Sequence, residues 1–270
     1  MSETNIEKKQ SERDRITIRG VHFDNVTLDE AVEIVTGFAA ERQAKVVHTP
    51  NSEIVQLCIE QPEYYDLINS ADLTIPDGSG VVLASKILGT PLSKGKVAGV
   101  ELAERTVAYA AEKGIGVYFL GGKPGVAETA AKKMCEKYPG LHIAGCHDGY
   151  FEKSGEQNDA VVAAINASDA AVLFVCLGVP AQEKWMAENR SKLQVGVMAG
   201  LGGTLDVFAG TVKRAPKIFI KLGLEWFYRL LKEPRRIGRM MKLPKFLFGT
   251  LFFRIRKGKQ SKSQNKKPKG

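Results

Sequence analysis

Residues Gly116–Gly125 read GVYFLGGKPG, an apolar run that ends in a glycine-rich turn. A helical pattern, Val126–Tyr138, follows the turn directly. Strands that are apolar on every residue, rather than on alternate residues, are typical of parallel sheets covered on both faces. The stretch therefore predicts a strand, a turn and a helix that belong to an α/β sheet.

The same alternation of strand and helix extends outward in both directions along the chain. Strands are expected at Ile16–Phe23, Lys45–His48, Asp72–Ile75, Gly116–Leu120, His142–Cys146, Ala171–Leu177 and Val195–Ala199. Helices are expected at 27–42, 52–60, 62–70, 78–88, 100–113, 126–138, 156–167 and 180–190. The predicted fold class is α/β, a mainly parallel Rossmann-like sheet with helices on both faces.

Length and composition set the domain organisation. The 270 residues favour one large domain with an appendage. A polar leader over residues 1–15 is expected to be disordered, and the α/β catalytic domain is expected over residues 16–212. The four cysteines form no CxxC pair, so no zinc knuckle or disulfide scaffold is indicated. No uncharged run approaches the roughly 20 residues of a spanning helix.

The charge is divided unevenly along the chain. Residues 213–270 carry 19 Lys and Arg against two acids, a net charge of +17, whereas residues 1–212 carry −8. Aromatic and aliphatic residues alternate with cations over 213–256, which predicts a helical appendage that docks on an anionic membrane surface. Nothing resembles a nucleic-acid-reading module, so nucleic acid is not expected as a partner. Residues 257–270 lack apolar side chains and are expected to be a disordered basic tail.

Several polar residues follow the predicted strands, where ligands bind in such sheets. Asp77, just before Gly78-Ser-Gly80, suits a general base, although it could instead cap the next helix. Thr49 and Asn51 could bind a sugar or phosphate, and capping is again the alternative. Gln182 could bind sugar hydroxyls or simply start a helix.

Two further groups suit a diphosphate. The turn with Gly121, Gly122, Lys123 and Gly125 can present backbone N–H groups at a helix start, although a tight turn needs glycine anyway. Its spacing matches neither GxGxxG nor a Walker loop. The cations Arg229, Arg236 and Arg239 would lie near one face of an uninterrupted helix, which Pro234 could kink. No HExxH or DxD occurs, so neither a metal nor another cofactor is expected.

Several short motifs, taken together and in their order along the chain, resemble those of the WecG/TagA/CpsF glycosyltransferases. The resemblance covers about residues 16–245. The motifs are TPNSE at 49–53, ADLTIPDGSG at 71–80, FLGGKPG at 119–125, GYF at 149–151, GVPAQEKW at 178–185, the stretch 200–210, and RAP, EW and EPR at 214–216, 225–226 and 233–235.

The resemblance implies an inverting, metal-independent enzyme at the inner face of the cell membrane. It would move N-acetylmannosamine from UDP-ManNAc to undecaprenyl-diphosphate-GlcNAc, as in the linkage unit of wall teichoic acid. A donor such as UDP-ManNAcA, for another surface polysaccharide, is the alternative. The sequence leaves the donor, the pathway and the oligomeric state open, including a homo-oligomer.

The resemblance also assigns roles to residues. Asp77 matches the family's proposed catalytic base, and Thr49, Asn51 and Gln182 match pocket residues. The three C-terminal arginines match those thought to close over the site. Lys96 and Glu101 stand where family members usually have Arg and Asp; Lys96 keeps the charge but loses the bidentate fork.

Two interpretations that assign the chain to another functional class remain open at this point. A dinucleotide-binding oxidoreductase could use the same sheet, but the glycine spacing disfavours it. A non-enzymatic membrane adaptor would leave the polar residues at the strand ends unexplained.

Overall fold

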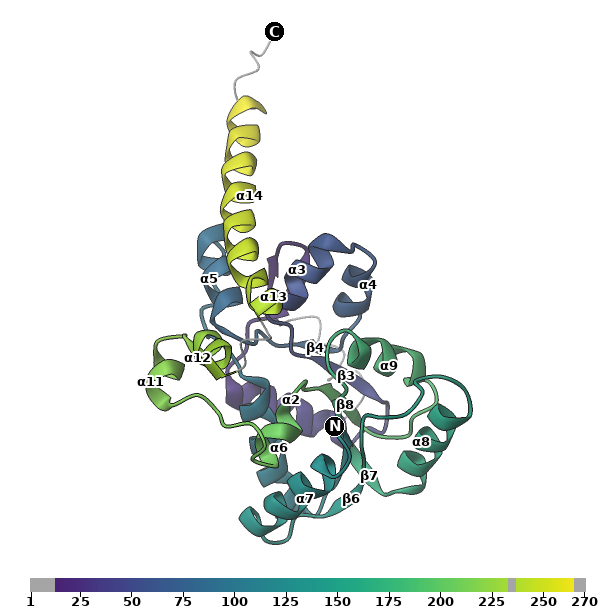
Figure 1. Cartoon of the computed structure of the whole chain (residues 1–270). Helices are drawn as coiled ribbons and strands as arrows, with labels where there is room; N and C mark the ends of the chain where they lie inside the picture. Colours follow the sequence, from purple (N-terminus) through teal and green to yellow (C-terminus); the bar gives the residue numbers. More distant parts are fainter. Residues whose placement is uncertain (1–12, 233–236, 265–270) are drawn as a thin grey trace.

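The computed structural model describes residues 13–232 and 237–264. Six strands form one sheet in which every neighbouring pair is parallel, in the order β4-β3-β8-β7-β5-β6 (Figure 1). Their bounds are β3 (Lys45–His48), β4 (Leu73–Thr74), β5 (Gly116–Gly121), β6 (Ile143–His147), β7 (Ala170–Cys176) and β8 (Val197–Gly200). The predicted parallel α/β sheet is confirmed.

Helices cover both faces of this sheet, as the apolar strands predict. Because side chains alternate along a strand, Phe119 and Phe174 face one core and Leu120 and Leu173 face the other. The first core is closed by α2 (Leu28–Ala39), α6 (Gly99–Lys113), α7 (Val126–Lys137) and α10 (Thr204–Phe208). The second is closed by α8 (Gly155–Ala167) and α9 (Ala181–Asn189).

One expected strand is in fact a hairpin. The prediction of a single strand over Ile16–Phe23 is wrong, because β1 (Arg15–Ile18) and β2 (Val21–Asp24) pair antiparallel. The chain turns at Arg19 and Gly20, which both have positive φ, as two-residue hairpin turns require. Tyr65 Oη donates a hydrogen bond of 2.7 Å to Arg19 O and holds this turn from a distant helix.

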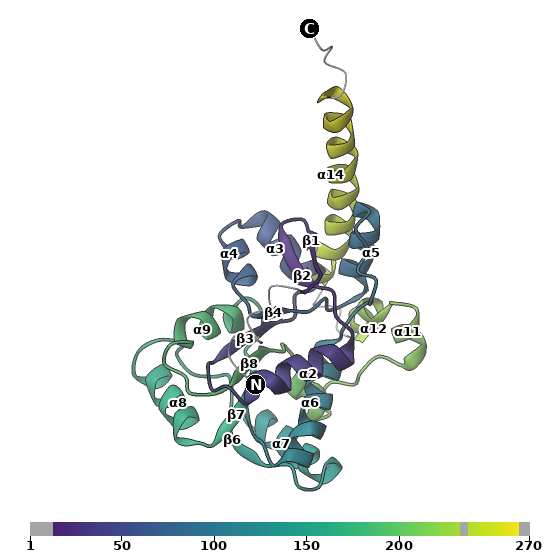
Figure 2. The ribbon, with the colours of Figure 1, turned by 180° about the vertical axis from the view of Figure 1, so that it is seen from behind.

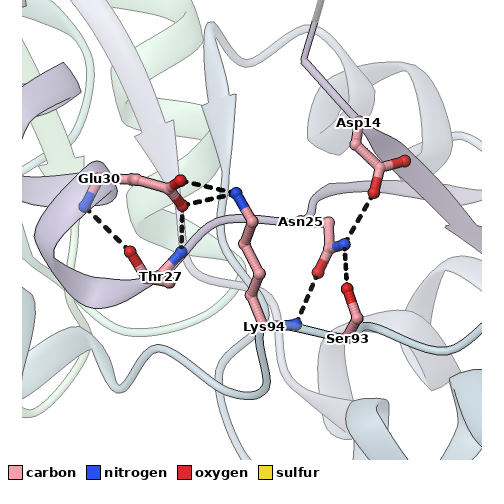
Figure 3. A network of polar contacts seen from close by, with 6 residues as sticks. All are labelled: Asp14, Asn25, Thr27, Glu30, Ser93 and Lys94. Carbon is pink, nitrogen blue, oxygen red and sulfur yellow. Dashed lines mark hydrogen bonds and ion pairs between the residues drawn. The ribbon is translucent and has the colours of Figure 1, made fainter.

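The start of α2 is fixed by the expected capping box (Figure 3). Glu30 N donates to Thr27 Oγ1 at 3.2 Å, and Thr27 N donates to Glu30 Oε2 at 2.7 Å. Lys94 Nζ lies 2.6 Å from Glu30 Oε1, and Lys94 N donates to the buried Asn25 Oδ1 at 3.1 Å. These contacts hold the loop that leads to Lys96.

A third core lies beyond the sheet and includes the C-terminal part of the chain. The hairpin packs there with α3 (Ser52–Glu60), α4 (Tyr64–Asn69) and α5 (Ser79–Leu88). Phe246 enters this core from α14 and is 0% exposed. The apolar core therefore extends past residue 212, where the sequence predicts the catalytic domain to end.

The basic C-terminal segment is helical, as expected, but it consists of several helices. They are α11 (Lys217–Lys221), α12 (Glu225–Lys232), α13 (Ile237–Met240) and α14 (Lys242–Gln264). Figures 1 and 2 show α14 running away from the sheet, with its base beside α5 and α3. The helix includes residues 257–264, the first part of the stretch that the sequence predicts to be disordered. None of the described helices has both the length and the apolar composition needed to cross a membrane.

Candidate active site

The carboxyl ends of β3, β4, β7 and β8 bring the predicted polar residues to one edge of the sheet. Thr49, just after β3, donates from Oγ1 to Gly200 O at the end of β8, at 2.8 Å. Asp77 N, after β4, donates to Pro50 O at 3.3 Å. Ligands bind at this edge in open parallel sheets.

Asp77 is half-buried at this edge and lies two residues before α5. The N-cap position of α5 is Gly78, which has no side chain that could cap this helix. Asp77 therefore lies one residue before the N-cap position of α5 rather than at it. Asn51 lies beside it, because a Cβ built on Gly78 would be 3.9 Å from Asn51 Cβ.

Asn51 and Thr49 both have structural roles. Asn51 Oδ1 caps α3 by accepting from Glu53 N at 2.9 Å and Ile54 N at 3.2 Å, as expected. No described residue accepts from its Nδ2, so that group can still meet a ligand. Thr49 is 8% exposed and its hydroxyl hydrogen is directed at Gly200 O.

Gln182 is buried at the start of α9 and holds the loop after β8. Its Oε1 accepts from Gly202 N at 2.9 Å, and its Nε2 donates to Glu183 Oε1 at 2.8 Å. The sequence analysis did not single out Glu183, which is 1% exposed. Burial raises the pKa of this carboxyl to about 7. No sequence signal marks Glu183, because polar residues are ordinary in the first turn of a helix.

The glycine-rich turn after β5 has the strand–turn–helix geometry that the sequence predicts. Gly121 has a φ of +130°, and a Cβ there would lie 2.3 Å from Cys176 O, so only glycine fits. Gly125 occupies the N-cap of α7 without a side-chain capping bond, which leaves backbone N–H groups of the first turn for an anion. Lys123 is exposed on this turn.

Tyr150 lies beside this turn. In the sequence analysis it is quoted only as part of the GYF motif and is assigned no role in the site. Its neighbour Gly149 donates from N to Gly122 O at 2.8 Å, which joins the two loops. The Tyr150 side chain is 69% exposed. An exposed aromatic ring next to this turn could stack on a nucleotide base if the turn held a diphosphate.

The C-terminal helices are tied to this edge of the sheet by polar contacts. Ser79 Oγ donates to Gly223 O at 2.8 Å, directly after the Asp77-Gly78 pair. Lys96 Nζ lies 2.8 Å from Glu225 Oε1, with both side chains about a quarter exposed. Lys96 therefore has a partner within the chain as well as the ligand role that the sequence suggests.

A second ion pair ties the chain just before the C-terminal helices to the body. It joins Arg214 to Glu101, the position that departs from the family pattern. Both ion pairs bridge residues that are more than 100 positions apart in the sequence.

The three predicted arginines are only partly described. Arg229 lies on α12 and Arg239 on α13, and these are separate helices rather than one uninterrupted helix. The side chains of both, and the whole of Arg236, lie outside what the structure describes. Across the described ranges, no three His, Cys, Asp or Glu side chains gather in a way that could hold a metal ion.

Comparison with known proteins identifies a family and its relatives. The model of the "Glycosyl transferase WecG/TagA/CpsF family" matches residues 16–260. Two relatives, from Staphylococcus aureus strains MW2 and NCTC 8325 / PS 47, are each 36% identical over 243 residues. The match covers 89% of this chain and 94% of each relative. Both relatives are named N-acetylglucosaminyldiphosphoundecaprenol N-acetyl-beta-D-mannosaminyltransferase.

Proposed function

Since this chain belongs to the WecG/TagA/CpsF family of glycosyl transferases, we propose that it transfers N-acetylmannosamine from UDP-ManNAc to undecaprenyl-diphosphate-GlcNAc. The enzyme class follows from the family, because its model spans most of the chain. The names of the relatives support the acceptor and the transferred sugar. Transfer of the corresponding uronic acid from UDP-ManNAcA is the alternative.

Asp77 acts as the general base in this reaction. Its carboxylate takes the proton of the acceptor hydroxyl as that oxygen attacks the anomeric carbon, and the bond from this carbon to UDP breaks with inversion. One observation carries the assignment: Asp77 lies half-buried at the ligand-binding edge of the sheet, where its backbone N–H donates to Pro50 O. A carboxylate at this edge can reach a bound acceptor, which suits a general base.

The departing diphosphate carries negative charge, which positively polarised groups must stabilise. The uncapped start of α7 offers backbone N–H groups and Lys123 adds a cation. Lys96 keeps donors beyond the one directed at Glu225, because an ammonium has three. In this proposal the leaving diphosphate is also stabilised by Arg229, Arg236 and Arg239, in place of a divalent cation.

Thr49, Asn51 and Gln182 shape the sugar pocket. The Nδ2 group of Asn51 is the donor best placed to meet a sugar oxygen, because its Oδ1 is already taken by α3. Thr49 and Gln182 act on the pocket through the loop after β8, which both of them hold. Tyr150 stacks on the uracil ring beside Gly122.

The enzyme works as a peripheral protein on the inner face of the cell membrane, where the lipid-linked acceptor is found. The C-terminal helices support this location, because they combine cations with exposed apolar side chains. Those side chains include Ile218, Leu222, Leu231, Ile237, Phe248 and Phe252, each 58–66% exposed.

A direct assay tests the proposal. Full-length protein is incubated with undecaprenyl-diphosphate-GlcNAc, or a short-chain analogue, and a panel of UDP-sugars, and products are identified by mass. We expect addition of one N-acetylhexosamine from UDP-ManNAc, unchanged in EDTA. Turnover of UDP-ManNAcA alone would favour the alternative donor, and loss of activity in EDTA with rescue by Mg²⁺ would contradict the metal-independent leaving-group chemistry.

A further inference from the structure

A cavity of about 670 Å³ lies apart from the candidate active site. Its lining comes from β1 and the turn after it, the C-terminal end of α5 and one face of α14. Figure 2 shows these three elements side by side. Asp77 lies near the opposite end of α5, whose ten residues span about 15 Å. The site assigned to sugar transfer does not use this cavity.

The cavity is strongly cationic. Its lining includes Arg15, Arg19, Arg254 and Lys257 and no acidic residue. Arg15 has a partner, since its Nε lies 3.0 Å from Asp24 Oδ1. Among the described residues, no carboxylate forms an ion pair with the other three cations. Such a concentration of positive charge favours an anionic ligand.

Arg19 supplies the most specific observation. Its Nη1 is buried and has no hydrogen-bond partner within the described part of the chain. The guanidinium lies over the ring of Phe253, 4.8 Å from its centroid, so packing fixes its orientation. A buried donor without an acceptor costs free energy, which a bound anion would recover.

Arg254, on α14, also lines the cavity. One of its terminal nitrogens, Nη1, donates to Ile87 O at the end of α5, which positions the guanidinium. Two oriented guanidinium groups and a lysine suit a phosphate group, which arginine binds in a bidentate manner. We propose that this cavity binds the phosphate headgroup of an anionic membrane lipid.

A lipid, rather than free phosphate, fits the surroundings of the cavity. On α14, which forms one wall, Phe248, Leu251, Phe252 and Ile255 are 44–65% exposed. The acyl chains of a lipid can pack against these apolar side chains, whereas a free anion cannot. The site holds the middle of α14 to a lipid and does not depend on the sugar that the enzyme transfers.

Binding of the full-length protein to phosphatidylcholine vesicles with and without phosphatidylglycerol tests this proposal by co-sedimentation. Thr90 lines the cavity and is exposed, so Thr90→Trp fills the space without changing the charge. Arg19→Gln removes the unpartnered donor. Arg256→Gln is the matched control, because it removes a charge from α14 outside the cavity.

Arg19→Gln should weaken binding to phosphatidylglycerol vesicles about tenfold, as the loss of a charged hydrogen bond implies. Thr90→Trp should weaken it at least as much, because the indole ring occupies the space of the headgroup. Arg256→Gln should weaken it about fivefold or less, the effect of one surface charge. Thermal melts check that each variant folds, and Arg254→Gln replaces either one that does not.

Two results would overturn the proposal. If the cavity variants bind as the Arg256→Gln control does, the basic residues act only as a diffuse charge. If inorganic phosphate displaces the protein from vesicles at micromolar concentration and constant ionic strength, the ligand is free phosphate rather than a lipid. Because the readout is binding alone, neither result depends on the proposed sugar transfer.

Discussion

At the scale of single residues, Asp77 is distinguished by its place at the ligand-binding edge of the sheet, two residues before α5. Asp77→Asn keeps the volume of the side chain but cannot take a proton. We expect kcat to fall by about 10²–10⁴-fold, the usual contribution of a positioned base. The melting temperature should change little, because asparagine has the same size and can make the same capping contacts as aspartate.

Steady-state kinetics and a thermal melt of the Asp77→Asn protein check this pair of expectations. Asn51→Ala is the matched control, because Asn51 does cap a helix, α3. It should cost about 1 kcal/mol of stability. An Asp77→Asn enzyme with normal turnover would remove Asp77 from the catalytic role.

Glu183 is the residue whose environment differs most from what its sequence context suggests. Burial raises its pKa to about 7 from an ordinary 4.5, so the folded protein keeps this proton to higher pH than the unfolded chain does. Stability should therefore fall as pH rises from about 4.5 to about 7. The pKa difference corresponds to about 3 kcal/mol.

The Glu183→Gln variant tests this pH dependence. A glutamine can still accept from Gln182 Nε2 but carries no charge. In denaturant unfolding at pH 5 and pH 8, the variant should gain stability relative to the parent at the higher pH. An equal difference at both pH values would show that Glu183 has an ordinary pKa.

At the scale of elements, the close approach of α5, α3 and α14 depends on one glycine. A Cβ at Gly80 would lie 2.0 Å from Ser52 Oγ and 2.5 Å from Leu243 Cδ1. Gly80→Ala must therefore displace the Ser52 hydroxyl and the end of the Leu243 side chain from their packed positions, at a cost of about 1–3 kcal/mol. Activity should fall as well, because α5 begins beside Asp77.

Gly37→Ala is the control for this substitution. Gly37 lies inside α2, is exposed, and has nothing within 4 Å of an added Cβ. Alanine there should stabilise the protein by about 0.5–1 kcal/mol. Chemical denaturation of both variants measures the contrast, and a neutral Gly80→Ala would mean that the three helices adjust without strain.

At the scale of the whole molecule, α14 has two faces with different roles. Phe246 is 0% exposed in the third core, whereas Phe248 and Phe252 are 65% and 64% exposed. Replacing Phe248 and Phe252 with Ser should remove most binding to anionic vesicles and leave the unfolding free energy nearly unchanged. Phe246→Ala should instead cost about 3–5 kcal/mol of stability.

Vesicle co-sedimentation and denaturant unfolding separate the two effects. Undiminished vesicle binding by the Phe248→Ser, Phe252→Ser protein would show that the exposed face of α14 does not meet the membrane. For Phe246→Ala, the same two measurements should show a lower free energy of unfolding and unchanged vesicle binding.

The features that follow from sequence alone are those that depend on near neighbours. The bounds of β3 and α3 match the prediction, because an apolar run and an Asn at the N-cap are local signals. The capping box of Thr27 and Glu30 forms for the same reason. The hairpin escaped prediction, since its turn at Arg19 and Gly20 is stabilised by Tyr65, a residue far along the chain.

The candidate site likewise has features that the sequence predicts and features that it does not. Parallel strands place Thr49, Asn51, Asp77 and Gln182 at one edge, so their association could be predicted from the order of strands and helices. The pairing of Lys96 with Glu225 could not, because 129 positions separate the two residues. Nor could the burial of Glu183, since no local pattern says which side of a helix start faces the interior.

The sequence by itself determined the α/β class, the parallel sheet, the turn after β5 and the basic, aromatic character of the C-terminal segment, because these rest on periodicity and composition. Tertiary structure alone decided the strand order, the burial of Phe246 in the third core and the orphaned Arg19 donor in its cavity. The physical reason is that these features arise where chain segments far apart in sequence meet. Such meetings depend on how all the helices and strands pack together, and no short stretch of residues encodes that packing.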